Sequence, residues 1–162
     1  MEKLYEHEFL IVKDTNLSGK RYFSFNLYQI SHSPYLIVKR MGISDDFFSC
    51  IYKVFSNIKT YSPWLDGSDA AVTKGLNRFE ITQFDYEASK EIIKQCKLSI
   101  EEYEDAPAAT IVLKGDESYI QEENIIMTMQ KKDVVLFWNK LYKMAQYFCD
   151  KKEDLYFIHL GA

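Results

Sequence analysis

Two long segments with apolar residues at three-to-four spacing constrain the fold of this chain more than any other feature. The first covers residues 86–103, and the second begins at Asp133. Apolar residues at this spacing form a stripe along one side of a helix, and that stripe must be buried against another element. The predicted inward positions are Ile92, Ile93, Cys96 and Ile100 in the first helix and Val134, Phe137, Trp138, Leu141, Ala145 and Phe148 in the second.

Shorter segments that alternate or are rich in β-branched and aromatic residues predict strands on either side of these helices. The first three strands are joined by short turns, which favours an antiparallel meander. The predicted strands are residues 4–13, 21–30, 35–41, 78–82, 110–114, 124–130 and 155–160.

A third helix is predicted from Ser44 to about residue 59. The Ser44 hydroxyl can cap the free backbone amides, and Asp45 and Asp46 suit the positive end of the helix dipole. Residues 61–75 show no sustained period and are expected to form a long loop. Long loops in compact domains often carry function.

The element order is therefore βββ-α-β-α-ββ-α-β, without the βαβαβ rhythm of parallel sheets and without an internal repeat. It predicts an α+β fold, with a largely antiparallel sheet and about three helices packed on it. No linker rich in proline, glycine or serine divides the 162 residues, so we expect a single domain over residues 1–162.

Composition indicates a globular protein of the cytoplasm. The start of the chain does not resemble a secretory signal, and no apolar run approaches the ~20 residues of a membrane span. Cys50, Cys96 and Cys149 are far apart and odd in number, so we expect reduced thiols that pack in helices.

The charge is unevenly distributed along the chain. Residues 101–123 hold eight carboxylates and one lysine, Lys114, which gives a net charge of −7, whereas the whole chain has −4 and the remainder therefore +3. A local excess of this kind often faces a partner of opposite charge. The alternative is a helix end and a loop that only add solubility.

Catalytic and ligand-binding motifs are weak or absent from the sequence. His7, His32 and His159 lack the spacing of zinc ligands, so we expect neither a metal nor another cofactor. His32 lies in a predicted turn, and clustered solvated carboxylates lack the raised pKa of a catalytic acid. No glycine-rich phosphate loop occurs, and the net negative charge makes nucleic acid a poor partner.

The acidic segment and its aromatic residues are therefore the candidate binding surface, with two aromatic residues of the predicted loop as further anchors. Tyrosine and tryptophan often dominate interface energetics. The candidate residues are Glu101, Glu102, Tyr103, Glu104, Asp105, Asp116, Glu117, Tyr119, Glu122, Glu123, Tyr61 and Trp64.

In its size, acidity, aromatic content and α+β character, the whole chain resembles the immunity proteins of contact-dependent growth inhibition and related polymorphic toxin systems. The resemblance implies a cytoplasmic monomer that binds one cognate toxin domain, often a basic nuclease, one to one, without enzymatic activity and without membrane contact. One alternative is a small hydrolase or transferase with an acidic substrate-binding loop. Another is an acidic chaperone or adaptor for a secreted effector, which would usually be a dimer.

Overall fold

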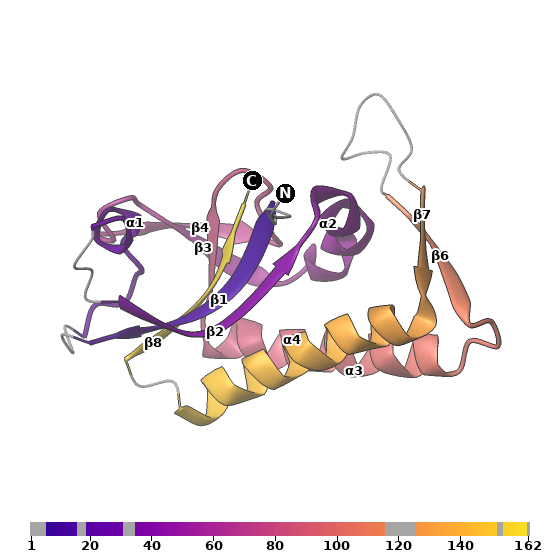
Figure 1. Cartoon of the computed structure of the whole chain (residues 1–162). Helices are drawn as coiled ribbons and strands as arrows, with labels where there is room; N and C mark the ends of the chain where they lie inside the picture. Colours follow the sequence, from indigo (N-terminus) through magenta and orange to yellow (C-terminus); the bar gives the residue numbers. More distant parts are fainter. Residues whose placement is uncertain (1–5, 16–18, 31–34, 116–125, 152–153, 162) are drawn as a thin grey trace.

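Long helices lie along one face of a strongly twisted sheet in the computed structural model (Figure 1). The structure describes residues 6–15, 19–30, 35–115, 126–151 and 154–161. Among these residues, no helix has both the length and the apolar character that a membrane span requires. The elements form one α+β domain, as predicted, and every strand pair is antiparallel.

The main sheet has six strands in the order β2-β1-β8-β5-β3-β4. The first and last strands of the chain, β1 and β8, are neighbours near its centre, and β2 and β4 form its edges. The strands are β1 (His7–Asp14), β2 (Tyr35–Ile43), β3 (Lys59–Pro63), β4 (Ala70–Lys74), β5 (Ile81–Phe84) and β8 (Leu155–Leu160).

The helices α3 (Tyr86–Glu104) and α4 (Lys131–Lys151) pack side by side against this sheet. The shorter α2 (Asp45–Ile51) continues as a 3₁₀ turn, η1 (Tyr52–Phe55). Its buried side chains join the same core as those of α3 and α4. The main core between sheet and helices is largely aromatic. Its most deeply buried large side chains are Phe9, Phe48, Phe55, Phe84, Trp138, Leu141 and Phe157.

A two-stranded hairpin lies at one end of the helical layer. It consists of β6 (Thr110–Lys114) and β7 (Ile126–Gln130) and connects α3 to α4. A helix is present at each of the three predicted places, and the predicted strands at both chain ends are confirmed. The three cysteines are free thiols in α2, α3 and α4.

The strand predicted at residues 21–30 is wrong. Residues Phe25–Tyr28 form a short helix, α1, which the Ser24 side chain caps. The backbone beside it is satisfied by a side chain instead of a neighbouring strand, because the Phe23 amide donates to Gln83 Oε1 at 2.8 Å and Gln83 Nε2 donates to the Arg21 carbonyl at 2.8 Å. Phe23 thereby covers the second face of the sheet, against Leu10 and Ile158 among others.

The long loop predicted at residues 61–75 is also wrong, because most of this segment forms the β3–β4 hairpin. Its turn contains Gly67 at a φ of 71°, where a Cβ would come within 3.0 Å of the Tyr22 carbonyl oxygen. The helix predicted to reach residue 59 ends early, because Ile51 passes into η1 and β3 begins at Lys59. A short turn between Pro63 and Ala70, which contains Trp64, therefore lies where a long loop was expected.

Candidate protein-binding surface

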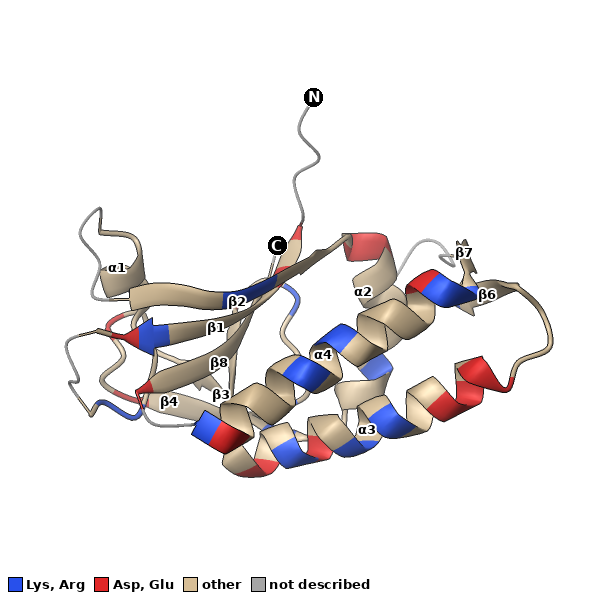
Figure 2. Ribbon diagram, turned by 60° about the horizontal axis from the view of Figure 1, so that its bottom comes forward, with Lys and Arg blue, Asp and Glu red and all other residues tan. Residues whose placement is uncertain are grey.

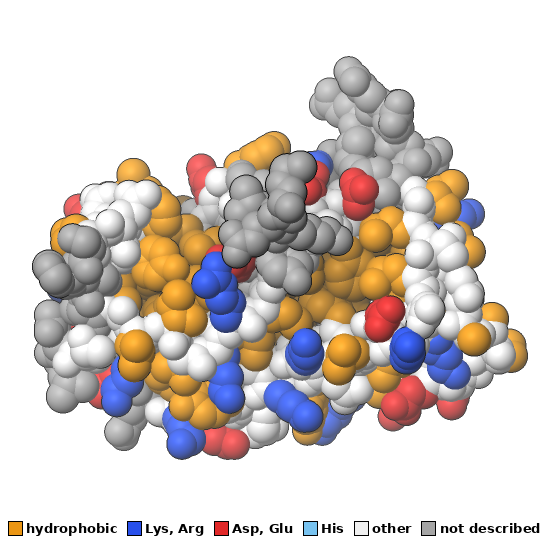
Figure 3. Space-filling view, viewed as in Figure 1, with side chains coloured by type: hydrophobic (Ala, Val, Ile, Leu, Met, Phe, Trp, Pro, Cys, Tyr) orange, Lys and Arg blue, Asp and Glu red, His pale blue; other side chains and the backbone are white. Residues whose placement is uncertain are grey.

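A largely apolar groove of about 630 Å³ lies between α1, the β3–β4 turn and the start of β5. Hydrophobic side chains gather at two places on the face drawn in Figure 3, one beside α1 and one between α2 and the β6–β7 hairpin. We call the hollow of about 630 Å³ the aromatic groove. Its lining residues are Phe25, Ser62, Pro63, Trp64, Leu65, Ala71, Phe79, Glu80, Ile81, Leu160 and Gly161.

Three large apolar side chains of the groove are largely exposed. Trp64 is 57% exposed, Leu65 61% and Phe79 73%. Scattered exposed apolar residues are normal, but a contiguous group around a hollow is typical of a binding site. Removing these three side chains from water would favour association by several kcal/mol, at roughly 25 cal/mol per Å².

The backbone around Trp64 and Leu65 is held firmly. The Trp64 amide donates to the Asp69 carbonyl at 2.8 Å, and the Gly67 amide donates to the Trp64 carbonyl at 2.8 Å. The Leu65 carbonyl accepts from the Ser24 hydroxyl at 3.1 Å and from the Asn26 amide at 2.9 Å. The turn is therefore preorganised, which lowers the entropy lost on binding.

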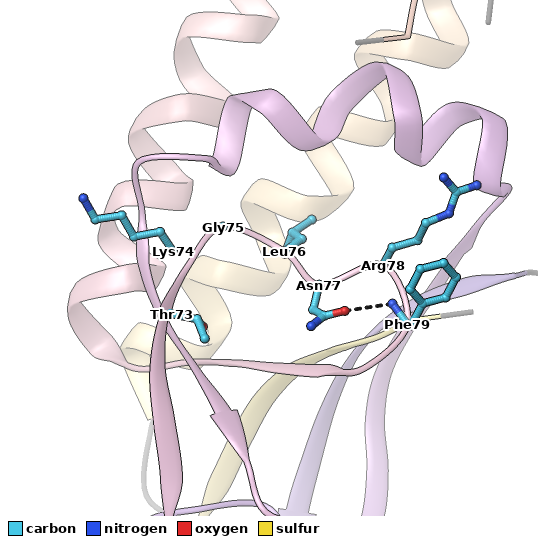
Figure 4. A pocket seen from close by; sticks show the side chains of 7 residues that line it. All are labelled: Thr73, Lys74, Gly75, Leu76, Asn77, Arg78 and Phe79. Atoms are coloured by element: carbon cyan, nitrogen blue, oxygen red, sulfur yellow. Dashed lines mark hydrogen bonds between the residues drawn. The ribbon is translucent and has the colours of Figure 1, made fainter. Parts of the chain in front are cut away.

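The opposite wall of the groove belongs to the segment between β4 and β5. This segment also lines a second hollow of about 400 Å³, from Thr73 to Phe79 (Figure 4). The side-chain oxygen of Asn77 accepts from the Phe79 amide at 2.9 Å and from the Glu80 amide at 3.2 Å. The turn so formed presents the Phe79 ring to solvent.

Three carboxylates lie on or next to the rim of the groove. Asp66, Asp69 and Glu80 are all exposed. Within the described part of the chain, their side chains accept hydrogen bonds only from hydroxyl, side-chain amide and backbone amide groups. Hydrogen bonds from the Ser68 amide and hydroxyl lower the pKa of Asp66. The groove therefore combines apolar walls with an anionic rim, which suits a partner with apolar and basic side chains.

A buried pair of histidines lies at the end of the sheet where β1 begins and β8 ends. His7 Nδ1 and His159 Nε2 are 3.1 Å apart, and His7 Nε2 is 2.7 Å from Asp45 Oδ1 at the start of α2. The Arg78 guanidinium forms an ion pair with the other oxygen of Asp45. We call these four residues the histidine cluster.

The partners assign the tautomers of both rings. The Asp45 carboxylate can only accept, so His7 Nε2 carries a proton. His7 Nδ1 must then accept from His159 Nε2. His159 Nδ1 is left as a buried lone pair without a hydrogen-bond partner among the described residues.

Both imidazoles of the cluster are held neutral. Burial, and then the Arg78 charge, lower the pKa of His7 to about 4. Burial, and then the His7 ring, lower the pKa of His159 to about 3. Both residues are fully buried, so neither ring can touch a substrate in this conformation. His32 lies outside the described residues.

The first part of the predicted acidic surface lies at the C-terminal end of α3. Glu101, Glu102, Glu104 and Asp105 are exposed there, and we call them the acidic tip (Figure 2). Tyr103 is half-buried, and burial, followed by the Glu102 charge, raises the pKa of its phenol. The remaining predicted residues Asp116, Glu117, Tyr119, Glu122 and Glu123 lie outside the described residues.

Carboxylates at this end of a helix oppose the helix dipole, and like charges four residues apart repel each other. The backbone carbonyls of this end are capped by Lys131, whose Nζ donates to the Glu104 carbonyl at 2.6 Å and to the Ala106 carbonyl at 2.9 Å. The acidic tip is therefore expected to weaken α3 locally.

The structure separates the two aromatic anchors predicted from the sequence. Trp64 is exposed in the groove, but Tyr61 is buried, at 6% exposure. The acidic tip adjoins the β6–β7 hairpin, whereas the groove adjoins α1 at the other end of the molecule (Figure 1). The predicted residues that the structure describes therefore do not form one surface.

Leu65, Phe79 and the carboxylates of the rim were not predicted from the sequence. The available signal was the Trp-Leu-Asp-Gly run at residues 64–67, where a turn dipeptide directly follows two large apolar residues. An apolar pair held at a turn is readily exposed. Phe79 offered no such signal, because it lies in a segment predicted as a strand.

Compared with models of protein families, with curated proteins and with solved structures, the chain matches none. Among the described residues, no three or more His, Cys, Asp or Glu side chains are grouped so that they could hold a metal ion.

Proposed function

We propose that this protein is a cytoplasmic inhibitor that binds one basic protein partner, one to one, through the aromatic groove. It would act as immunity proteins of polymorphic toxin systems do, by covering a functional surface of a toxin domain. The observation that carries the proposal is the group of exposed Trp64, Leu65 and Phe79 side chains around a preorganised hollow. Aromatic anchors of this kind commonly supply most of the binding energy of an interface.

The acidic residues select the charge of the partner. Asp66, Asp69 and Glu80 beside the groove would meet lysine or arginine at the rim of the interface. The acidic tip lies outside this interface, so its expected contribution is to accelerate encounter through the long-range field. Binding should therefore weaken with salt mainly through a slower association rate.

A pull-down from the lysate of the native host tests the proposal, with three forms of the tagged protein. The wild type should retain a basic protein in equimolar amount. The double variant Trp64→Ser and Phe79→Ser should lose it. The matched control is Leu98→Ser on α3, which removes a similarly exposed apolar side chain, 52% exposed, away from the groove and should retain the same protein.

The inhibitory role requires a further step. The retained protein, expressed in bacteria without this chain, should arrest growth, and co-expression of the wild type should restore it. Co-expression of the groove variant should not. Equal retention by the wild type and the groove variant would place the interface elsewhere, and a harmless retained protein would contradict inhibition.

A further inference from the structure

A continuous line of contacts connects the buried histidines to the aromatic groove. It runs from His159 to His7, to Asp45 and to Arg78 by the hydrogen bonds and the ion pair described above. The Arg78 guanidinium also lies over the Phe79 ring, with its central carbon 5.8 Å from the ring centroid. In Figure 4, Arg78 reaches toward the start of α2 with Phe79 beside it.

The arrangement of hydrogen bonds at the histidines tolerates only the neutral state. A proton on His7 Nδ1 would meet the N–H of His159 Nε2, 3.1 Å away, unless His159 moved its own proton to Nδ1. A proton on His159 Nδ1 would be a buried donor without an acceptor among the described residues. Either arrangement leaves a buried N–H group without an acceptor, which opposes protonation of the pair.

The surroundings of the pair are defined on every side. Asp45 of α2 and Arg78 face His7, and Glu6 acts on it from the start of β1. The Phe48 ring of α2 stacks on His7 with centroids 4.1 Å apart. Thr82 of β5 is in register with His159, and Ile43 of β2 is in register with His7.

Arg78 and His7 share the carboxylate of Asp45 and repel each other when both are charged. Because Arg78 disfavours protonation of His7, a protonated His7 must disfavour the bound position of Arg78 by the same free energy. The two partners differ in access to water, since the Arg78 side chain is 21% exposed and His7 is fully buried. Arg78 is therefore the group that leaves when both compete for Asp45.

We propose that the histidine cluster is an acid-sensitive latch: when His7 is protonated, Arg78 is released from Asp45, and the segment of residues 76–80, which contributes Phe79 and Glu80 to the groove wall, loosens. Protonation of the buried histidines would thus loosen the wall of the aromatic groove. The consequence for partner binding rests on the function proposed above, but the latch itself does not.

Hydrogen exchange without any partner tests the latch. Protection of residues 76–80 should be compared at about pH 7.5 and about pH 5.5, after correction for intrinsic exchange rates, with α3 as an internal reference. In the wild type we expect the opening of residues 76–80 to increase by up to about tenfold at the lower pH, while α3 changes less.

Three variants locate the effect. His7→Phe keeps the stack on Phe48 but cannot take up a proton, so residues 76–80 should stay protected at both pH values. Arg78→Gln removes the ion pair at a partly exposed position, so they should be open at both. His32→Gln removes the remaining histidine outside the cluster and should behave as the wild type.

Equal protection of residues 76–80 in the wild type at both pH values would overturn the latch. Wild-type protection of these residues in Arg78→Gln at pH 7.5 would overturn it as well. The Arg78→Gln result also keeps the test decisive if His7→Phe does not fold. No partner is present in these measurements. The exchange data can therefore contradict the latch while the groove still binds its partner, and they can support the latch even if the groove binds no partner.

Discussion

Gly161 lies directly against the backbone of Arg78. The Gly161 amide donates to the neighbouring Glu80 carbonyl at 3.1 Å. A Cβ at position 161 would overlap the Arg78 carbonyl oxygen and come within 2.8 Å of the Glu80 nitrogen. The C-terminal end of β8 and the wall of the aromatic groove are therefore coupled through a contact that only glycine permits.

We predict that Gly161→Ala pushes residues 78–80 away from β8. Because the obstructing atoms belong to the backbone, they cannot move aside as a side chain would, and the loss of stability should be about 1–3 kcal/mol. Urea unfolding followed by circular dichroism measures it. An unchanged midpoint would mean that this segment moves freely relative to β8.

The histidine cluster also predicts how global stability depends on pH. The pKa values of His7 and His159, about 4 and about 3 in the folded protein, lie below the value of 6.5 expected when the chain unfolds. The unfolded state therefore binds more protons below pH 6.5, so stability is greatest above that pH and falls as acid is added. Each proton contributes a slope of about 1.4 kcal/mol per pH unit, or about 2.7 for both.

Urea unfolding at a series of pH values between about 7.5 and 5 measures this slope. His159→Phe should reduce it by about half, since one of the two titrating groups is removed. His32→Gln should not change the contribution of the cluster. A wild-type stability that is flat over this range would contradict the assignment of two neutral buried histidines.

The acidic tip predicts a gain of stability when its charge is removed. Glu101→Gln with Glu104→Gln relieves repulsion with the helix dipole and should stabilise the protein by about 0.3–1 kcal/mol for each carboxylate. The matched control is Glu87→Gln in the first turn of α3, where a carboxylate suits the dipole and its loss should destabilise. Thermal unfolding at low and high salt measures both changes, which should shrink together as salt screens the charges.

The sequence was a good guide to the helical layer of this fold. Every predicted inward residue of α4 is buried, from Val134 to Phe148, because a period of 3.6 is a local signal that does not depend on distant residues. The candidate site was less accessible to prediction. His7 and His159 are 152 positions apart, and only the pairing of β1 with β8 brings them together.

Residues 21–30 show why alternation alone can mislead. Phe23, Phe25 and Leu27 alternate with polar residues as in a strand, but the segment pairs with no strand among the described residues. Its backbone is held in part by side chains, among them that of Gln83, 60 positions from Phe23, which accepts from the Phe23 amide. A sequence pattern reports which side chains alternate, but it does not report which group will accept a backbone hydrogen bond.

This arrangement makes Gln83 a strong determinant of stability. Gln83→Leu keeps much of the volume of the side chain but leaves the buried Phe23 amide and the Arg21 carbonyl without the partners they have now. Two unsatisfied groups should cost about 2–4 kcal/mol. The half-buried Gln95 of α3 provides the control, since Gln95→Leu should change stability by less than about 0.5 kcal/mol.

Phe23 packs on the second face of the sheet next to α1, so Gln83→Leu should also increase hydrogen exchange of residues 23–28. If both variants unfold at the same urea concentration, water must replace the Gln83 amide, and the cover of that face would not depend on it.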